Sequence, residues 1–368
     1  MARRARGARK GQSLQLSNRS DSLVGTPDVT RQDYGQELLS VNNLSVDFVS
    51  VDGRVRILNG VSLKISKGEV VGVVGESGSG KTTLCLTILG LLDSPPAQIS
   101  NGEIIFEGQD LLKLDADAMH RIRGTRINMV FQEPLDSLNP VYKVESQIKE
   151  SLETKDEADG DEPAKRSRSD SNQLMAELLK NLCIDEPDEV LKEYPHELSG
   201  GMRQRVSISM SIIESPKLLI ADEPTTGLDA YVQNRILRIL TDMRKSGMTL
   251  LYVTHDLTVA SQVCDRLYIM YAGRLMEVGN TKEVLENSFH PYTTTLIASV
   301  PHGFEDSPPL PVQLGEPPDL KRLPTGCKFH PRCPYAKEIC KREEPMLKEV
   351  TPGRSAACWK FDSDGRFS

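Results

Sequence analysis

Short apolar runs recur along the chain, and each is bounded by polar or turn-forming residues. Residues 69–74, 217–222 and 248–256 are rich in Val, Leu and Ile, which is typical of buried strands. Residues 38–48 and 61–65 alternate apolar and polar positions, as half-buried strands do. The complete set of predicted strands is 38–48, 61–65, 69–74, 103–108, 126–131, 217–222 and 248–256. The pattern predicts an α/β fold.

Helical spacing dominates between the strands at 126–131 and 217–222. Residues 145–153 and 173–182 are amphipathic at helical spacing. Between them, residues 154–172 are charged and lack large apolar side chains, so we expect a mobile surface loop there. The pattern predicts a helical subdomain at about 134–215, inserted into the α/β scaffold.

Composition limits the classes of function. The 368 residues are enough for about two domains. A net charge of −7 argues against a general nucleic-acid partner, which calls for a basic face. No run of about 18 apolar residues occurs, so no membrane span is predicted. Residues 1–35 are expected to be a disordered basic tail, with weak binding to anionic lipid or a transit peptide as alternatives.

A glycine-rich loop follows the first buried run. Residues 69–83, EVVGVVGESGSGKTT, combine a strand, the spacing G-x-x-x-x-G-K-T at 75–82 and the start of a helix. This is the context of a phosphate-binding P-loop, whose glycines let backbone N–H groups face the phosphates. Lys81 would supply charge to the outer phosphates, and the Thr82 hydroxyl could bind Mg²⁺.

Polar residues at later strand and helix ends suit the same chemistry. Ser199 with two glycines begins a predicted helix, which is a second possible anion-binding arrangement. Asp222 and Glu223 end a buried strand, where one carboxylate can hold Mg²⁺ and the next can activate a water. His255 ends another strand at the edge where α/β ligands bind. A lone His is more often structural, but this position favours function.

Taken together, these motifs resemble the ATP-binding-cassette (ABC) ATPases. The P-loop is followed by Gln132 after a strand, LSGGM at 198–202, IADEP at 220–224, GLD at 227–229 and His255. Beyond them, HPYTTTLIASVP and the terminal cysteines resemble the ATPase subunits of oligopeptide and dipeptide importers. Many cassettes have Gln where this chain has Met202. The ATPases of peptide importers resemble this chain in departing from that Gln.

The resemblance implies a P-loop NTPase fold with a RecA-like core, an antiparallel β subdomain, the inserted helical subdomain and a cysteine-rich regulatory or cluster-binding tail. It implies an ABC ATPase domain at 36–290 and a transporter-type extension at 291–368. Phe48, by itself an ordinary core aromatic, falls where the family stacks adenine. The implied ATP-binding residues are Phe48, Gly75, Glu76, Ser77, Gly78, Ser79, Gly80, Lys81, Thr82 and Thr83.

The same resemblance assigns roles in hydrolysis. Glu223 would be the general base, and His255, Gln132 and Lys81 would complete the catalytic set. Mg²⁺ would be held by Thr82, Gln132 and Asp222. The signature motif would act on the ATP of a partner subunit through Leu198, Ser199, Gly200, Gly201 and Met202, and Asp229 would lie at the dimer seam.

A single P-loop implies a dimer. The resemblance implies a heterodimer with a paralogous ATPase subunit, two integral permeases that contact residues 132–145, and an external peptide-binding protein. The chain would be peripheral, on the cytoplasmic face of the membrane. Its function would be ATP-driven uptake of dipeptides and oligopeptides, with nickel or another small solute as the alternative cargo. A soluble ABC ATPase outside transport is less favoured, because translation factors of this class carry two P-loops.

Four of the seven cysteines lie in the last 42 residues. Cys327, Cys333, Cys340 and Cys358 have the spacing C-x₅-C-x₆-C-x₁₇-C, which lacks the close pairs of structural zinc sites. The spacing and the family resemblance favour a [4Fe–4S] cluster. Zinc, disulfides or free thiols are alternatives, and His330 could replace one cysteine. A structural role is expected, because nothing in the sequence connects the segment to the ATP site.

Overall fold

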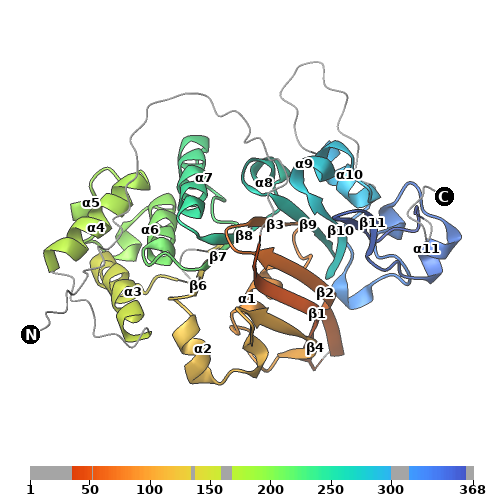
Figure 1. The fold of residues 1–368 in the computed structure, drawn as a ribbon, viewed down its shortest axis with the longest axis horizontal. Helices are drawn as coiled ribbons and strands as arrows, with labels where there is room; N and C mark the ends of the chain where they lie inside the picture. Colours follow the sequence, from red (N-terminus) through yellow and green to blue (C-terminus); the bar gives the residue numbers. More distant parts are fainter. Residues whose placement is uncertain (1–34, 52, 134–136, 159–167, 300–314, 362–368) are drawn as a thin grey trace, which may run out of the picture. The chain divides into compact units, whose positions relative to one another are not determined.

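The structure is a computed structural model that describes residues 35–361, except residues 52, 134–136, 159–167 and 300–314. Its larger sheet has eight strands in the order β11-β12-β10-β9-β3-β8-β7-β6, and the run from β9 to β6 is parallel (Figure 1). All side chains of β3, β7 and β8 are buried, as their apolar runs predicted. The strands of this sheet are β3 (Val70–Val74), β6 (Ile127–Val130), β7 (Leu218–Asp222), β8 (Thr249–Thr254), β9 (Arg266–Tyr271), β10 (Arg274–Asn280), β11 (Lys348–Thr351) and β12 (Arg354–Ala356).

A second, antiparallel sheet has the order β2-β1-β4-β5 and packs its apolar side chains into the core formed with β3. Its strands are β1 (Glu37–Ser50), β2 (Gly53–Ser66), β4 (Ala97–Phe106) and β5 (Gln109–Asp110). β4 begins six residues before the predicted position. Residues 98–103 are exposed, and pairing with β1, rather than an apolar pattern, makes them a strand.

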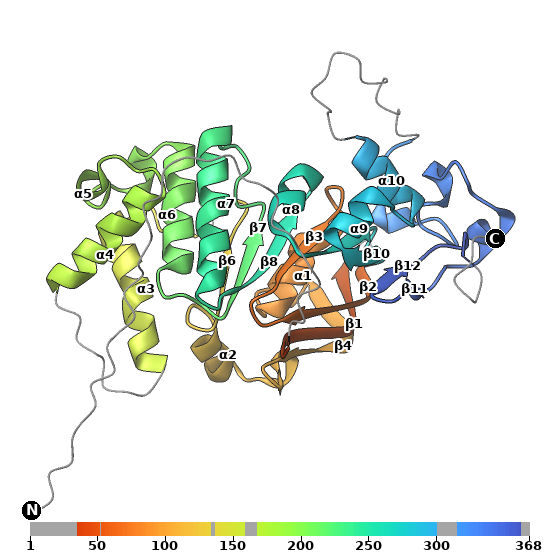
Figure 2. The ribbon, with the colours of Figure 1, turned by 45° about the horizontal axis from the view of Figure 1, so that its top comes forward.

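A group of helices lies beside the β6 end of the larger sheet (Figure 2). It consists of α3 (Val144–Ala158), α4 (Arg168–Asn181), α5 (Pro187–Val190), η3 (Pro195–Glu197) and α6 (Gly200–Ile212). These elements share a hydrophobic core of their own, which includes Ile148, Met175 and Val206.

The charged segment 154–172 differs from the loop expected there. α3 continues to Ala158 and α4 begins at Arg168, so both ends of the segment are helical. Glu, Lys and Arg are good helix formers, which explains why charge alone did not end these helices. Residues 159–167 lie outside the described residues, as does the predicted tail apart from residue 35.

The remaining helices cover the sheets or belong to the C-terminal part of the chain. They are α1 (Lys81–Ile88), η1 (Leu111–Lys113), α2 (Ala116–Ile122), α7 (Ala230–Lys245), α8 (Leu257–Val263), α9 (Thr281–Glu286), α10 (Pro291–Ala298), η4 (Leu320–Arg322), η5 (His330–Arg332) and α11 (Glu338–Arg342). None of the described helices is both long enough and apolar enough to cross a membrane.

The C-terminal extension, residues 291–361, is joined to the larger sheet rather than attached beside it. β12 pairs with β10, and β11 pairs with β12. The buried carboxylate of Glu277 on β10 accepts hydrogen bonds from the backbone N–H groups of Phe289 and His290 and from Arg354 on β12. This one side chain therefore ties the start of α10 and the strand β12 to the sheet.

Candidate functional site

The P-loop connects β3 to α1 and is shaped by its glycines. A Cβ on Gly75 would lie 2.1 Å from the carbonyl oxygen of Met270. Gly80 has φ +100°, and a Cβ there would lie 2.9 Å from Leu58. No other residue type fits either position without displacement. The loop is therefore held close to β9 and β2, with α1 beginning directly after it at Lys81.

Lys81 lies folded over this loop. Its Nζ donates to the carbonyl oxygens of Gly75 at 2.7 Å and Glu76 at 3.0 Å. Burial lowers the pKa of Lys81, and the nearby carboxylates of Glu223 and Asp222 oppose that shift. The structure thus brings the predicted P-loop lysine beside both predicted strand-end carboxylates.

Asp222 fits the binding of a cation. Its side chain is 1% exposed, and neither carboxylate oxygen accepts a hydrogen bond of ordinary geometry within the described part of the chain. Burial raises the pKa of Asp222, and the neighbouring Thr82 hydroxyl and Lys81 ammonium only partly offset the effect. A buried carboxylate that its neighbours stabilise only in part costs free energy that a bound cation can recover. Asp222 and Thr82 are therefore suitably placed to hold Mg²⁺.

Glu223 is the centre of a polar cluster at the end of β7. Its φ of +47° is in the left-handed region, which is strained for a residue with a side chain and is common at functional sites. Its Oε1 lies 2.8 Å from Nδ1 of His255, and its Oε2 accepts from Thr226 at 3.1 Å and from Gln132 at 3.4 Å. His255 and Gln132, two of the predicted catalytic residues, thus contact the carboxylate of a third, Glu223, and Thr226 is a partner that the sequence did not predict.

Several other predicted residues have local roles in the structure. Ser199 caps α6 by accepting from the N–H of Met202, and Asp229 caps α7 by accepting from the N–H of Val232. Among the described residues, the signature segment 198–202 forms no hydrogen bond with the P-loop of its own chain. Phe48 is half-buried on β1 and packs against the core. An adenine contact by Phe48 stays a prediction.

The four C-terminal cysteines line one cavity of about 190 Å³, together with His330 and aromatic side chains. All seven cysteines are free, so the disulfide alternative is wrong. No three Cys, His, Asp or Glu side chains of the described residues are grouped closely enough to hold a metal ion. Burial raises the pKa of Cys327 to about 12 and also raises the pKa values of Cys333 and Cys358.

The cysteine-rich segment contacts the P-loop, which corrects the expectation that nothing connects the two. A structural role for the segment stays a prediction. Arg332 precedes Cys333 and forms an ion pair with Glu76. Tyr292 on α10 accepts a hydrogen bond from the backbone N–H of Glu76. Neither contact has a local sequence signal, because the partners lie more than 200 positions apart.

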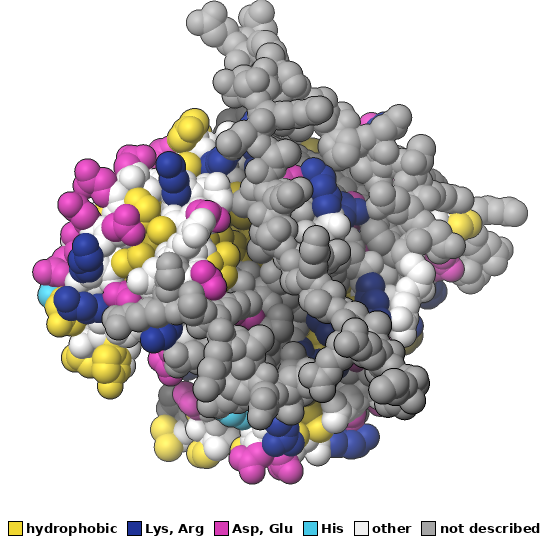
Figure 3. Space-filling view, turned by 60° about the vertical axis from the view of Figure 1, so that its left-hand side comes forward, with side chains coloured by type: hydrophobic (Ala, Val, Ile, Leu, Met, Phe, Trp, Pro, Cys, Tyr) yellow, Lys and Arg dark blue, Asp and Glu magenta, His cyan; other side chains and the backbone are white. Residues whose placement is uncertain are grey.

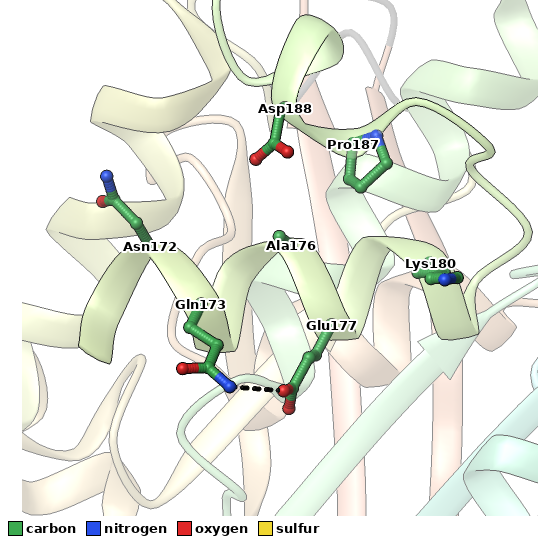
Figure 4. Close-up of a pocket in the computed structure, with 7 residues that line it drawn as sticks. All are labelled: Asn172, Gln173, Ala176, Glu177, Lys180, Pro187 and Asp188. Carbon is green, nitrogen blue, oxygen red and sulfur yellow. Dashed lines mark hydrogen bonds between the residues drawn. The ribbon is translucent and has the colours of Figure 1, made fainter. Parts of the chain in front are cut away.

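A separate hollow lies between α4 and α5 (Figure 4). Gln173 donates to Glu177 along α4, and Asp188 of α5 lies on the other side of that helix, over Ala176. The hollow lies on the helical group rather than on the β7–β8 edge. We assign it no chemical role.

Residues 58–226 match the family described as ABC transporter, and residues 276–340 match the oligopeptide/dipeptide transporter C-terminal region. The oligopeptide transport ATP-binding protein OppD of Escherichia coli is 40% identical over 345 residues, which span 92% of this chain and 98% of that protein. The chain belongs to the ATP-binding proteins of oligopeptide and dipeptide ABC transporters. The family predicted from the motifs is thereby confirmed.

Other relatives of this ABC ATPase agree. The dipeptide transport ATP-binding protein DppD of Haemophilus influenzae is 41% identical over 85% of this chain and 92% of its own length. A dimeric ATP-binding cassette, MJ0796, solved in a post-hydrolysis state with ADP and Pi, has a TM-score of 0.59 and 26% identity, covering 66% of this chain and 99% of that one. The predicted ABC ATPase fold and its ATP hydrolase activity are thus confirmed.

Proposed function

We propose that this ABC ATPase powers the uptake of dipeptides and oligopeptides through a membrane complex. The observation that carries the proposal is the meeting of Lys81, Asp222, Glu223 and His255 at one edge of the sheet. The chain also matches peptide transport ATP-binding proteins over nearly their full length. We divide the chain into an ATPase domain at 36–290, with its helical subdomain at about 134–215, and an extension at 291–368.

ATP would bind at Phe48 and along residues 75–83. The backbone N–H groups of the P-loop and the start of α1 provide partial positive charge for the phosphates. Lys81, which donates to two carbonyl oxygens of the loop, would supply positive charge to the outer phosphates. Thr82, Gln132 and Asp222 would hold Mg²⁺, which when bound neutralises charge on the phosphates.

Glu223 would act as the general base for the attacking water. The hydrogen bond from Thr226 and the contact with His255 orient its carboxylate, and the strained backbone fixes where that carboxylate points. His255 would contact the γ-phosphate, and Gln132 would link the site to the helical subdomain. General-base catalysis of this kind contributes roughly 10²–10⁴-fold to a rate.

Hydrolysis would take place in a heterodimer with a paralogous ATPase subunit. Ser199 and the glycines after it begin α6, so their N–H groups are available to an anion from outside the chain. Residues 198–202 and Asp229 would complete the partner's site. ATP between the subunits would favour the closed pair, and hydrolysis would release it.

Two integral permeases would receive this motion, and an external binding protein would deliver peptide. Val141 and Tyr142 lie in the predicted contact segment and are 70% and 58% exposed. Figure 3 shows hydrophobic side chains among acidic and basic ones on the side of the molecule that carries the helical group. This supports docking of a permease there. The chain would then be peripheral, at the cytoplasmic face of the membrane.

We also propose a [4Fe–4S] cluster at Cys327, Cys333, Cys340 and Cys358, with zinc as the alternative; the four thiols would have to draw together around either centre, because among the described residues they are not grouped as metal ligands. The support is that four separate positions in a segment of 32 residues line a single apolar cavity. Such a centre requires deprotonated thiols, so binding would release protons.

The test is ATPase activity of the reconstituted complex, assembled with both permeases and the paralogous subunit. Peptide-loaded binding protein should stimulate hydrolysis several-fold, and Ni²⁺ with its binding protein should not. Stimulation by Ni²⁺ with its binding protein, and none by the peptide-loaded binding protein, would contradict peptide uptake and favour metal transport.

A further inference from the structure

A buried ion pair connects the cysteine-rich segment to the P-loop. The guanidinium of Arg332 donates from Nη1 to Oε2 of Glu76 at 2.8 Å and from Nη2 to Oε1 at 2.9 Å. The two side chains are only 6% and 17% exposed. A two-pronged Arg–carboxylate pair at this burial fixes orientation as well as charge.

Further contacts hold both partners in place. Nη1 of Arg332 also donates to the hydroxyl of Tyr271 at 3.3 Å, and the guanidinium lies over the rings of Tyr271 and Phe329. The hydroxyl of Tyr292 accepts from the backbone N–H of Glu76 at 2.9 Å. The extension therefore holds Glu76 by its carboxylate and its backbone.

Glu76 is itself part of the phosphate-binding loop. Its carbonyl oxygen accepts from Lys81, and its position is the first after Gly75 in the P-loop. A carboxylate at this place would repel the phosphates of ATP if it were left unpaired. Arg332 neutralises that charge and prevents the side chain from turning toward the phosphates.

We propose that Arg332 is a positioning residue for nucleotide binding, through which the C-terminal extension sets the affinity of the P-loop for ATP. The proposal rests on the assignment of the P-loop as the ATP site. It does not require a metal centre, because the ion pair, the Tyr292 contact and the Tyr271 contact involve protein atoms alone.

Titration calorimetry of the full chain with Mg·ATP tests the proposal. Arg332→Met keeps the unbranched stem that packs on the aromatic rings but removes the charge. We expect a Kd about tenfold higher than in the unaltered chain, which is about 1.4 kcal/mol. Arg332→Lys keeps the charge but lacks the planar guanidinium, so its Kd should lie between those of the unaltered chain and Arg332→Met. In a Glu76→Gln background, where no charge needs neutralising, Arg332→Met should change the Kd less than about twofold.

Two controls distinguish positioning from a loss of folding. Arg342 is an exposed arginine of the same extension, 77% exposed and paired with Glu338 at 4.0 Å, so Arg342→Met should leave the Kd unchanged. A merely structural role would lower the binding stoichiometry, which counts folded chains, and leave the Kd as it was. A Kd that is unchanged in Arg332→Met, with or without a lower stoichiometry, would overturn the proposal. So would an equal rise of the Kd when Arg332→Met is introduced into the Glu76→Gln background. Absence of ATP binding by the unaltered chain would overturn the ATP site itself, and the proposal with it.

Discussion

Among the single residues, Glu223 has both the backbone conformation and the side-chain contacts of a functional residue. It combines a left-handed backbone with three side-chain contacts at distances from 2.8 to 3.4 Å. Strained backbone persists only where surrounding structure holds it, and here the N–H of Glu223 also donates to the carbonyl of Val253. The sequence located this carboxylate after a strand, but its φ angle and the Thr226 contact depend on tertiary structure.

Replacing Glu223 by Gln should keep the shape of the side chain and remove the base. We expect ATP hydrolysis by the assembled complex to fall at least about 100-fold, while ATP binding persists. Steady-state phosphate release and equilibrium ATP binding measure the two effects. Glu177→Gln, on α4 and outside the site, is the matched control and should hydrolyse ATP normally. Hydrolysis at the unaltered rate in Glu223→Gln would contradict the assignment of the base.

Lys81 should act on binding rather than on the chemical step alone. Its Nζ donates to two carbonyl oxygens of the P-loop, so Lys81→Ala removes charge that the phosphates need. We expect the Kd for ATP, measured by calorimetry, to rise at least about tenfold. An unchanged Kd would place the phosphates elsewhere.

Among the elements, four of the five parallel strands, β3, β6, β7 and β8, were predicted from the sequence, whereas the parallel strand β9 and the strands that follow it were not. β3, β7 and β8 are apolar throughout, so burial on both faces is visible in the sequence. β11 and β12 are short and mostly polar; β12 becomes a strand by pairing with β10, and β11 by pairing with β12. Pairing between distant segments leaves no local pattern, which also explains the early start of β4.

Glu277 provides a test of how the extension is attached. Glu277→Ala would leave two backbone N–H groups and Arg354 without their buried acceptor. We expect the free energy of unfolding to fall by about 3–5 kcal/mol, as measured by urea denaturation. Glu286→Ala removes an exposed carboxylate on α9 and should cost less than about 0.5 kcal/mol. Similarly small losses of unfolding free energy in both variants would show that Glu277 does not hold the extension to the sheet.

At the scale of the whole molecule, the extension and the ATPase domain share one sheet, and Arg332 connects them again at the P-loop. The P-loop motif predicted the ATP chemistry, because it is a local pattern, whereas the cluster expected from the cysteine spacing stays a prediction. The motifs did not predict that the two parts touch, because Glu76 and Arg332 are 256 positions apart. The ATP site and the cysteine-lined cavity are therefore neighbours through the turn at η5.

Metal analysis after anaerobic purification tests the proposed cluster. We expect about four irons and four sulfides per chain, with visible absorbance from thiolate-bound iron. Cys333→Ser should lose both, and Cys183→Ser, outside the cavity, should keep both. A colourless chain with one zinc, or with no metal, would contradict the cluster.

Hydrolysis of ATP at Glu223 should drive peptide uptake. The most direct measurement is uptake of a labelled oligopeptide into proteoliposomes that contain the complete complex and enclosed ATP, with binding protein outside. Uptake should require enclosed ATP and should fall at least about 100-fold with Glu223→Gln, in step with hydrolysis. Peptide uptake that continues at the unaltered rate in this variant, or in vesicles without ATP, would contradict the account.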